Sequence, residues 1–213
     1  MTEPDTQRPP VFEMIAGNVC LDFVNTLDDR PTEKPKELLK TYYDLGKFAQ
    51  EAGILTMRQL DYLLENAHLK LEEAEQALRH ARELREALHE IFWAVIIKKS
   101  SAPQAAIDIL NQNVHDAALH SRLASQDGRF EWRFDDLTSS FAGVLWPIAR
   151  AAADLLASAD VGLVRACSSP TCQWLFLDTS KNHHRRWCSM KLCGNRSKVR
   201  KFYARKRNTL GRG

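Results

Sequence analysis

The sequence lacks any long hydrophobic run, which limits where the protein can reside. Its longest uninterrupted apolar stretch, residues 91–97, has only seven residues, whereas a membrane-spanning helix needs about 20. The first ten residues are polar and proline-rich, and they contain no apolar signal region. We therefore expect a cytoplasmic protein with no membrane partner.

Patterns typical of catalysis are missing as well. There is no glycine-rich phosphate loop, no nucleophile motif and no pair of acids in a suggestive context. An enzyme would have to be centred on Cys20 or on Asp22 and Asn25. Cys20 lies among apolar residues, where a buried small side chain is the simpler interpretation. The sequence therefore predicts a protein that is not an enzyme.

Cysteines are few but grouped. Four of the five form two pairs, each with four intervening residues, and fifteen residues separate the pairs. Two short loops with this spacing can present four thiolates to one tetrahedral zinc ion. Disulfides would need an oxidising compartment, of which the sequence gives no sign, and unrelated free thiols are the other alternative. We predict one structural Zn²⁺ bound by Cys167, Cys172, Cys188 and Cys193.

Four protein ligands leave no open position for a reactive water, so the predicted zinc is structural rather than catalytic. His183 and His184, between the two pairs, are possible substitute ligands, but four cysteines already fill the site, so both are interpreted as loop residues. The same interval, residues 173–187, is long enough for a strand, a turn and a returning strand. Trp174, Phe176 and Trp187 are expected to form the small core of the module, although stacking on unpaired bases is the alternative.

Acidic residues are absent from the last 35 positions. Twelve of the thirty Lys and Arg residues lie between Thr179 and Gly213, and none of the twenty-seven Asp and Glu residues does. The formal charges are therefore +12 for this segment and −9 for the remainder, which gives the net +3 of the chain. Such a segment on a metal-bound scaffold is typical of contact with nucleic-acid phosphates.

Helical spacing continues this basic segment from Arg196 to Arg207. Leu192, Val199, Phe202 and Tyr203 fall on one side, and we expect them to pack back over the metal site. Cations would then project elsewhere, although those nearest the thiolates could instead offset the negative charge of the metal cluster. The candidate nucleic-acid contacts are Arg186, Arg196, Lys198, Arg200, Lys201 and Arg205.

These motifs resemble the bacterial CGNR zinc-finger family, which takes its name from the sequence seen here as Cys193-Gly194-Asn195-Arg196. Members carry an N-terminal α/β module, the ABATE domain, with a Leu-Asp-Phe-Val-Asn-Thr signature that this chain has at residues 21–26. The resemblance spans nearly the whole chain. It implies a treble-clef-like zinc module and a stress-related transcription regulator, and from that role DNA is favoured over RNA.

The N-terminal region is predicted to be mostly helical. Residues 11–27 suggest a strand, a turn, and a second strand or short helix, in which the polar signature residues fix a turn or, alternatively, line a small-ligand pocket. Helices are expected at 36–52, from a cap at Thr56 to Asn66, and at 71–99. The charged face of the last, which includes Arg82 and Glu86, is expected to be solvated, and its apolar stripe to face the core or a second copy of the chain.

Pro103 is predicted to begin a further helix that fades near Asp116, since proline suits a first helical turn. Alternating residues at 117–124 and 129–134 predict a β-hairpin, and residues 137–159 a last helix that kinks or restarts at Pro147. His115 and His120 lack the neighbours that a second metal site needs. The fold expected is α+β: a mostly helical domain at residues 1–160 with a small hairpin, and a zinc finger at 161–213.

We expect a nucleic-acid-binding regulator in which the finger contacts phosphates and the N-terminal domain senses a ligand or forms a homodimer. The polymer is expected to be DNA, but cations alone do not distinguish DNA from RNA, because both carry the same phosphates. An RNA-binding protein is therefore one alternative. The other is a protein-interaction module whose zinc serves only its fold and whose basic tail meets an acidic partner.

Overall fold

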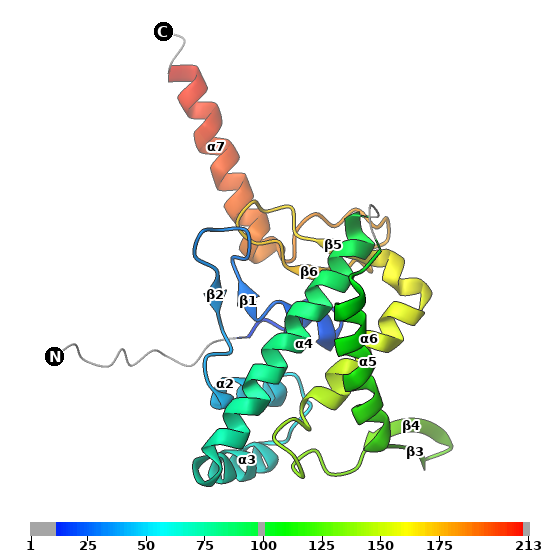
Figure 1. The fold of residues 1–213 in the computed structure, drawn as a ribbon. Helices are drawn as coiled ribbons and strands as arrows, with labels where there is room; N and C mark the ends of the chain where they lie inside the picture. Colours follow the sequence, from blue (N-terminus) through cyan, green and yellow to red (C-terminus); the bar gives the residue numbers. More distant parts are fainter. Residues whose placement is uncertain (1–11, 98–100, 211–213) are drawn as a thin grey trace, which may run out of the picture.

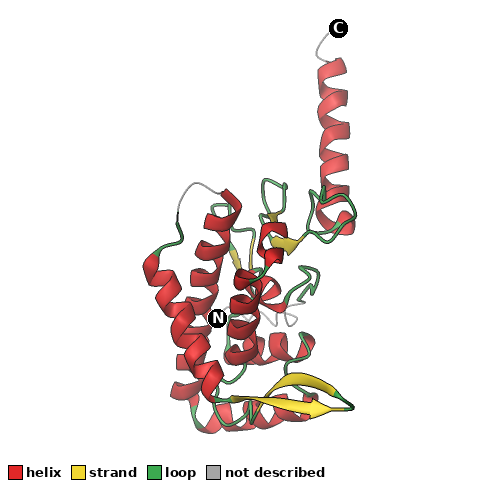
Figure 2. Cartoon of the chain, turned by 90° about the vertical axis from the view of Figure 1, so that its right-hand side faces the viewer, coloured by secondary structure: helices red, strands yellow, loops and turns green. Residues whose placement is uncertain are grey.

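The computed structural model describes residues 12–97 and 101–210, with the backbone alone for residue 201 and residues 204–210. A helical body carries a small finger, from which one helix projects (Figures 1 and 2). The body helices are α1 Val19–Val24, α2 Tyr42–Glu51, α3 Met57–Leu69, α4 Leu71–Ile97, α5 Gln104–Leu119 and α6 Leu145–Ala157, and the projecting helix is α7 Asn195–Leu210. None of the helices in these ranges is long and apolar enough to cross a membrane.

Strands are short and paired only in twos within the described chain. The antiparallel pairs are β1 Leu27–Asp28 with β2 Lys36–Glu37, β3 Ser121–Gln126 with β4 Arg129–Phe134, and β5 Val164–Ala166 with β6 Leu175–Leu177. A 3₁₀ helix, Ala159–Leu163, leads from α6 into β5, and a π-helical turn, Met190–Gly194, leads into α7. The predicted α+β class, mostly helical with a small hairpin, is confirmed.

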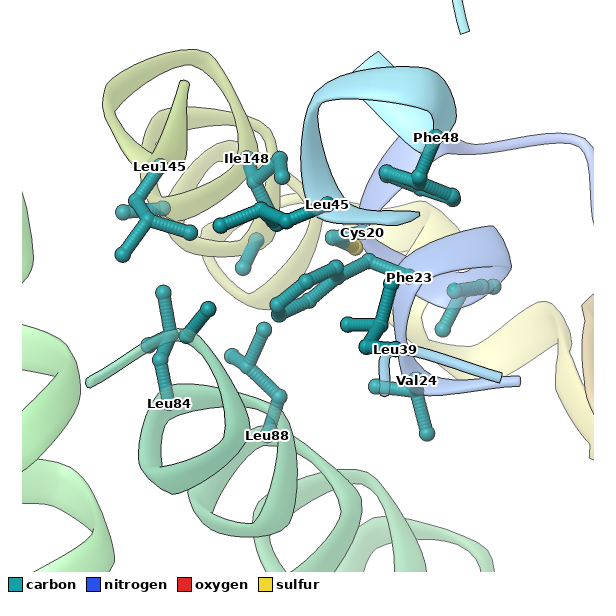
Figure 3. Close-up of a cluster of buried hydrophobic side chains, with 14 of the residues drawn as sticks. Cys20, Phe23, Val24, Leu39, Leu45, Phe48, Leu84, Leu88, Leu145 and Ile148 are labelled. Carbon is teal, nitrogen blue, oxygen red and sulfur yellow. The ribbon is translucent and has the colours of Figure 1, made fainter. Parts of the chain in front are cut away.

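The core of the body surrounds the short helix α1. Phe23 of α1 is fully buried among Leu45 of α2, Leu84 of α4 and Ile148 of α6, and Cys20 is buried beside it, as expected (Figure 3). Burial raises the pKa of the Cys20 thiol far above its ordinary value. Cys20 therefore acts as a small apolar side chain in the centre of the core.

Two expectations for the N-terminal region were wrong. Residues 12–16 form no strand, and the helix predicted at 36–52 begins only at Tyr42. Its start is fixed by a capping box, in which Thr41 and Asp44 satisfy each other's backbone N–H groups. Residues 36–37 pair with β1 instead. Gly46 of α2 lies close to α3, because a Cβ there would lie 2.6 Å from Cδ1 of Leu60, whose side chain would have to move.

Helix α4 has the buried stripe that the periodicity predicts, but part of its charged face is structural rather than solvated. Arg82 donates to the carbonyl of Leu39 at 2.6 Å. Arg85, which is buried, binds both carboxylate oxygens of Glu37 at 2.6 and 2.7 Å. Glu86 accepts from Arg30 and Arg85. These bonds hold the loop between β1 and β2, β2 itself and the residues just after it against α4.

The predicted cap at Thr56 is confirmed, and α3 continues to Leu69. Pro103 precedes α5, which continues past Asp116 to Leu119. The last body helix starts at Leu145 rather than at residue 137, so Pro147 lies in its first turn, where no N–H partner is needed. The hairpin is confirmed, with Leu123 opposite Trp132 and a turn at residues 127–128, but its first strand is Ser121–Gln126 rather than residues 117–124, because α5 continues to Leu119. His120 stacks on Trp146, with ring centroids 3.9 Å apart, and lies in no metal-ligand cluster of the described chain.

The signature at residues 21–26 joins the body to the finger. The Asn25 side chain donates to the carbonyl of Leu175 at 2.9 Å and accepts from its N–H at 2.8 Å. The Asp22 carboxylate accepts from the N–H of Ala16, whose carbonyl in turn accepts from Leu177. The interpretation that these polar side chains fix the backbone is thus supported, and their partners include a strand 150 residues away.

Candidate metal centre and nucleic-acid interface

The first cysteine pair lies in the loop of a hairpin. Strands β5 and β6 pair in the register Ala166 with Leu175, so Cys167 and Cys172 fall in the connection between them. The N–H of Cys167 donates to the carbonyl of Trp174 at 2.8 Å, and that of Cys172 to Ser169 at 3.2 Å. Gln173 adopts a left-handed φ of 56° at the turn back into β6. This hairpin points both sulfurs into the interior of the finger, where they are buried.

The second pair lies where the projecting helix begins. Cys188 precedes the turn Met190–Gly194, in which Ser189 caps the N–H of Leu192, and Cys193 lies in that turn two residues before α7. Gly194 is buried, and a Cβ there would lie 2.7 Å from the sulfur of Met190. A glycine therefore lets the Met190 and Trp187 side chains lie close beside the second cysteine pair. A hairpin and a helix start that each supply two ligands form the treble-clef-like arrangement.

The four sulfurs meet at one point. All four are buried, and their Sγ atoms lie within 4.8 Å of one another. The separations are 3.8 Å for Cys172 to Cys188 and 3.7 Å for Cys188 to Cys193. Zn–S bonds of about 2.3 Å give tetrahedral S–S edges of about 3.8 Å, whereas a disulfide would place two sulfurs about 2.05 Å apart. The donor set thus fits one structural Zn²⁺, which offsets the charge of the thiolates.

The interval between the pairs contains one strand, not the predicted strand and return. Its strand, β6, pairs with β5, which lies before the first cysteine. The buried carboxylate of Asp178 organises the loop that follows, because it accepts from the hydroxyl and N–H of Ser180 and from the N–H of Arg185. The interval was long enough for a return strand, but these local hydrogen bonds satisfy the backbone instead.

Arg185 is a structural residue that the sequence interpretation did not single out. Its guanidinium donates to the carbonyls of Trp187 and Cys188, and to that of Ile15 in the body. It also lies over the ring of Phe176, 4.4 Å from the centroid. Because Arg185 directly precedes Arg186 in a basic segment, the sequence gives it the same pattern as a surface cation. No local sequence signal separates the two residues.

The aromatic residues of the finger are mainly core residues, as expected. Phe176 is fully buried, Trp174 is nearly so and Trp187 is partly buried. His183 and His184 are exposed loop residues outside the sulfur cluster, which agrees with their interpretation. The indole N–H of Trp174 has no partner in the described chain.

Helix α7 carries the predicted cations into solvent. Arg196, Lys198 and Arg200 are exposed, as is Arg186 in the loop before the second pair. None of these four forms an ion pair with a described acidic side chain. Burial raises the pKa of Asp29, in the loop after β1, and the charge of the nearby Arg196 offsets part of that rise. Lys201 and Arg205 belong to the same helix, but their side chains lie outside the described residues.

The apolar residues of α7 do not pack back over the metal, contrary to expectation. Val199, Phe202 and Tyr203 are 54%, 63% and 59% exposed. The helix leaves the finger directly after Cys193 and points away from the body (Figure 1). The core beneath the zinc site is already filled by Leu175, Phe176 and Trp174. The periodicity correctly placed these three apolar residues on one face of α7, but it gave no information about whether another part of the protein covers that face.

The fold and this site define a zinc-binding protein in which a mostly helical domain carries a treble-clef-like finger. Family models agree. The model ABATE, described as "Putative stress-induced transcription regulator", matches residues 17–159, and the model zf-CGNR, described as "CGNR zinc finger", matches residues 164–206. The chain belongs to the ABATE family and has a CGNR zinc finger at its carboxyl end. No curated protein matches the chain.

Proposed function

We propose that the protein is a DNA-binding transcription regulator whose finger uses its single zinc ion to hold α7 against nucleic-acid phosphates. The observation that carries this proposal is the position of Arg196, Lys198 and Arg200. They lie on a helix that begins two residues after a zinc ligand, are exposed, and have no described ion-pair partner. A helix fixed at one end by a metal presents its charges with little loss of backbone entropy on binding.

The dimensions of α7 suit a duplex groove. Its sixteen residues span about 24 Å at 1.5 Å per residue. The major groove of DNA, about 12 Å wide, admits one α-helix. Figures 1 and 2 show α7 standing clear of the body along most of its length, so groove walls can approach it from several sides. The family description as a transcription regulator favours DNA over RNA.

The N-terminal domain is assigned a regulatory role in this proposal, through a small ligand or a homodimer, and no enzymatic activity. This part of the proposal is supported by the burial of Cys20, Asp22 and Asn25, the residues on which catalysis would have centred, and by the backbone hydrogen bonds of Asp22 and Asn25. Cys20 lies in the hydrophobic core, and the side chains of Asp22 and Asn25 bond to backbone groups. The body thus supports and orients the finger.

The test is the salt dependence of DNA affinity in a charge-removal series. Lys198→Gln combined with Arg200→Gln should weaken duplex binding and reduce the slope of log affinity against log salt by about 1.8, since each phosphate contact contributes about 0.9. Lys70→Gln with Arg79→Gln removes two exposed cations from the body and is the matched control, for which affinity and slope should stay unchanged. An unchanged slope in the first variant would remove α7 from the interface.

A protein-interaction role is the second candidate, and the exposed Val199, Phe202 and Tyr203 favour it specifically. A helix with an apolar stripe between cations can also dock on an acidic, partly apolar protein groove. The two functions differ in their response to nuclease. A partner captured by the immobilised chain should survive nuclease treatment under this second candidate and disappear under the first.

A further inference from the structure

A pocket of about 670 Å³ lies in the finger beside the zinc ligands. Its walls come from the loop before and after Cys188 and from Ile15 of the body, and they include His184, Arg186, Trp187 and Met190. Pockets of about 300 to 1,000 Å³ are typical of small-molecule sites. Neither the zinc site nor the proposed phosphate contacts of α7 account for this volume.

The pocket has a fixed frame. Arg185, another lining residue, binds the carbonyls of Ile15, Trp187 and Cys188 and thereby ties the two walls together. The carbonyl of Arg186 accepts from the N–H of Ser168 at 2.8 Å, so the backbone of this residue is also held. The guanidinium of Arg185 is thus used in the frame, whereas that of Arg186 and the ring of His184 are exposed.

The lining combines cations with flat and apolar surface. The Arg186 guanidinium lies 5.5 Å from the centroid of the Trp187 ring. Met190, half exposed, and Trp187 both approach Gly194, so the thioether and the indole are neighbours in the lining of the pocket. An aromatic ring beside a polarisable thioether suits a planar ligand, and an adjacent guanidinium suits an anion.

The geometry points to a site for a single nucleotide, with the base against Trp187 and Met190 and its phosphate at Arg186 and His184. Met190 begins the turn that leads into α7, so the pocket is continuous with the basic helix. The nucleotide is therefore an unpaired one within the bound strand, and this part of the inference rests on the proposed function. A free mononucleotide has the same chemistry and is the alternative ligand for this pocket.

The experiment compares three labelled duplexes of about two helical turns, using the full, zinc-loaded chain and fluorescence anisotropy. One duplex is fully paired, one carries a single unpaired adenosine, and one carries an abasic nucleotide at that position. We expect the unpaired adenosine to raise affinity about tenfold over the paired duplex, the effect of stacking one base on an aromatic side chain. The abasic duplex should lose that gain. A separate calorimetric titration with AMP tests whether the pocket binds a free mononucleotide.

Variants of the lining residues test whether the preference for an unpaired adenosine comes from the pocket. Arg186→Gln and Met190→Ala should each reduce the tenfold preference to about threefold or less, because the first removes the guanidinium proposed for the phosphate and the second removes part of the surface proposed for the base. Lys181→Gln removes an exposed cation of the finger that does not line the pocket, and it should keep the full preference. Bound zinc is measured in each variant, so that loss of the fold is recognised.

The outcomes separate this inference from the proposed function. Equal affinity for the three duplexes, with steep salt dependence and no AMP binding, would overturn the nucleotide site and leave the DNA-binding proposal standing. Absence of DNA binding together with AMP binding that Arg186→Gln abolishes would support the site with a free ligand and refute the proposed function. Absence of both would overturn the two together.

Discussion

Asn25 and Leu175 exchange two hydrogen bonds across 150 residues, with N···O distances of 2.8 and 2.9 Å. The Asn25 side chain thus occupies the place of a neighbouring strand along β6 of the finger. Both residues are buried. Since β6 follows the first cysteine pair, this contact links the signature segment of the body to the loop that supplies two zinc ligands.

Replacing Asn25 with Ala should destabilise the folded chain by about 2 to 4 kcal/mol, because it leaves the N–H and carbonyl of Leu175 buried without partners. Urea unfolding of the zinc-loaded protein measures the loss. Asn111→Ala, at an exposed position of α5, is the control and should change the free energy of unfolding by less than about 0.5 kcal/mol. Equal effects from the two substitutions would show that the contact contributes nothing to stability.

Arg85 and Arg79 lie on the same helix in opposite environments. Arg85→Ala should cost about 3 to 5 kcal/mol, since it leaves Glu37 without its bidentate partner and removes a buried side chain. Arg79→Ala breaks only an exposed pair, 3.9 Å from Glu75, and should cost about 0.5 kcal/mol or less. Thermal and urea unfolding of the two variants provide the comparison. Similar losses would contradict the structural role given to Arg85.

Zinc stoichiometry tests the metal centre separately from DNA. Cys188→Ser should lower bound zinc well below one ion per chain, because the site then lacks its fourth thiolate. Cys20→Ala, which removes the remaining thiol from the core, should keep one ion. Elemental analysis of the purified variants gives the count. Full zinc in Cys188→Ser would mean that the ligand set is wrong.

Acidification should destabilise the chain through His89. Burial, with a smaller effect of Arg30, lowers the pKa of His89 to about 4, against about 6.5 in an unfolded chain. Between these values the unfolded chain binds a proton that the folded chain does not, so stability falls as the pH falls. His89→Gln should remove on the order of 1 to 2 kcal/mol of the loss measured between pH 7 and pH 5.

Asp22 provides the check of opposite sign. Burial raises its pKa to about 6, so the folded chain binds this proton more readily than the unfolded chain, and stability rises as the pH falls through this range. Asp22→Asn should therefore lose more stability on acidification than the unmodified chain. The measurement is the free energy of unfolding at several pH values for His89→Gln and Asp22→Asn, with bound zinc determined at each pH. The same pH profile in both would refute these assignments.

Sequence patterns correctly predicted those features of the fold that depend on residues near one another in the chain. The cap at Thr56, the helical spacing of α4 and the hairpin β3–β4 follow from residues that are close together in the chain. The metal site was predictable for another reason: the spacing of the four cysteines indicates a zinc site even though fifteen residues separate the two pairs. Long-range partners were not predictable in the same way. Nothing near Asn25 indicates that its amide pairs with Leu175, and nothing near Arg185 separates it from Arg186, because both differences depend on groups brought close only by the fold.

The projecting helix shows the same limit. Its spacing predicted one apolar face, and Val199 and Phe202 do have helical spacing. Whether that face is covered depends on where Cys193 directs the chain, and the finger directs it outward (Figure 2). The direction in which α7 leaves the finger could not be predicted from the sequence alone. The prediction of the cations depended only on charge, and Lys198 and Arg200 are accordingly exposed.

The central claim is that one zinc ion positions a cationic helix for phosphate contact. The most direct measurement is the affinity for labelled duplex DNA from about 50 to 200 mM salt, before and after removal of zinc by a chelator. We predict a slope of log affinity against log salt of about −4 or steeper for the zinc-loaded chain. Zinc removal should lower affinity at least about tenfold, because the helix then loses its fixed end. Unchanged affinity after complete zinc removal would contradict the account.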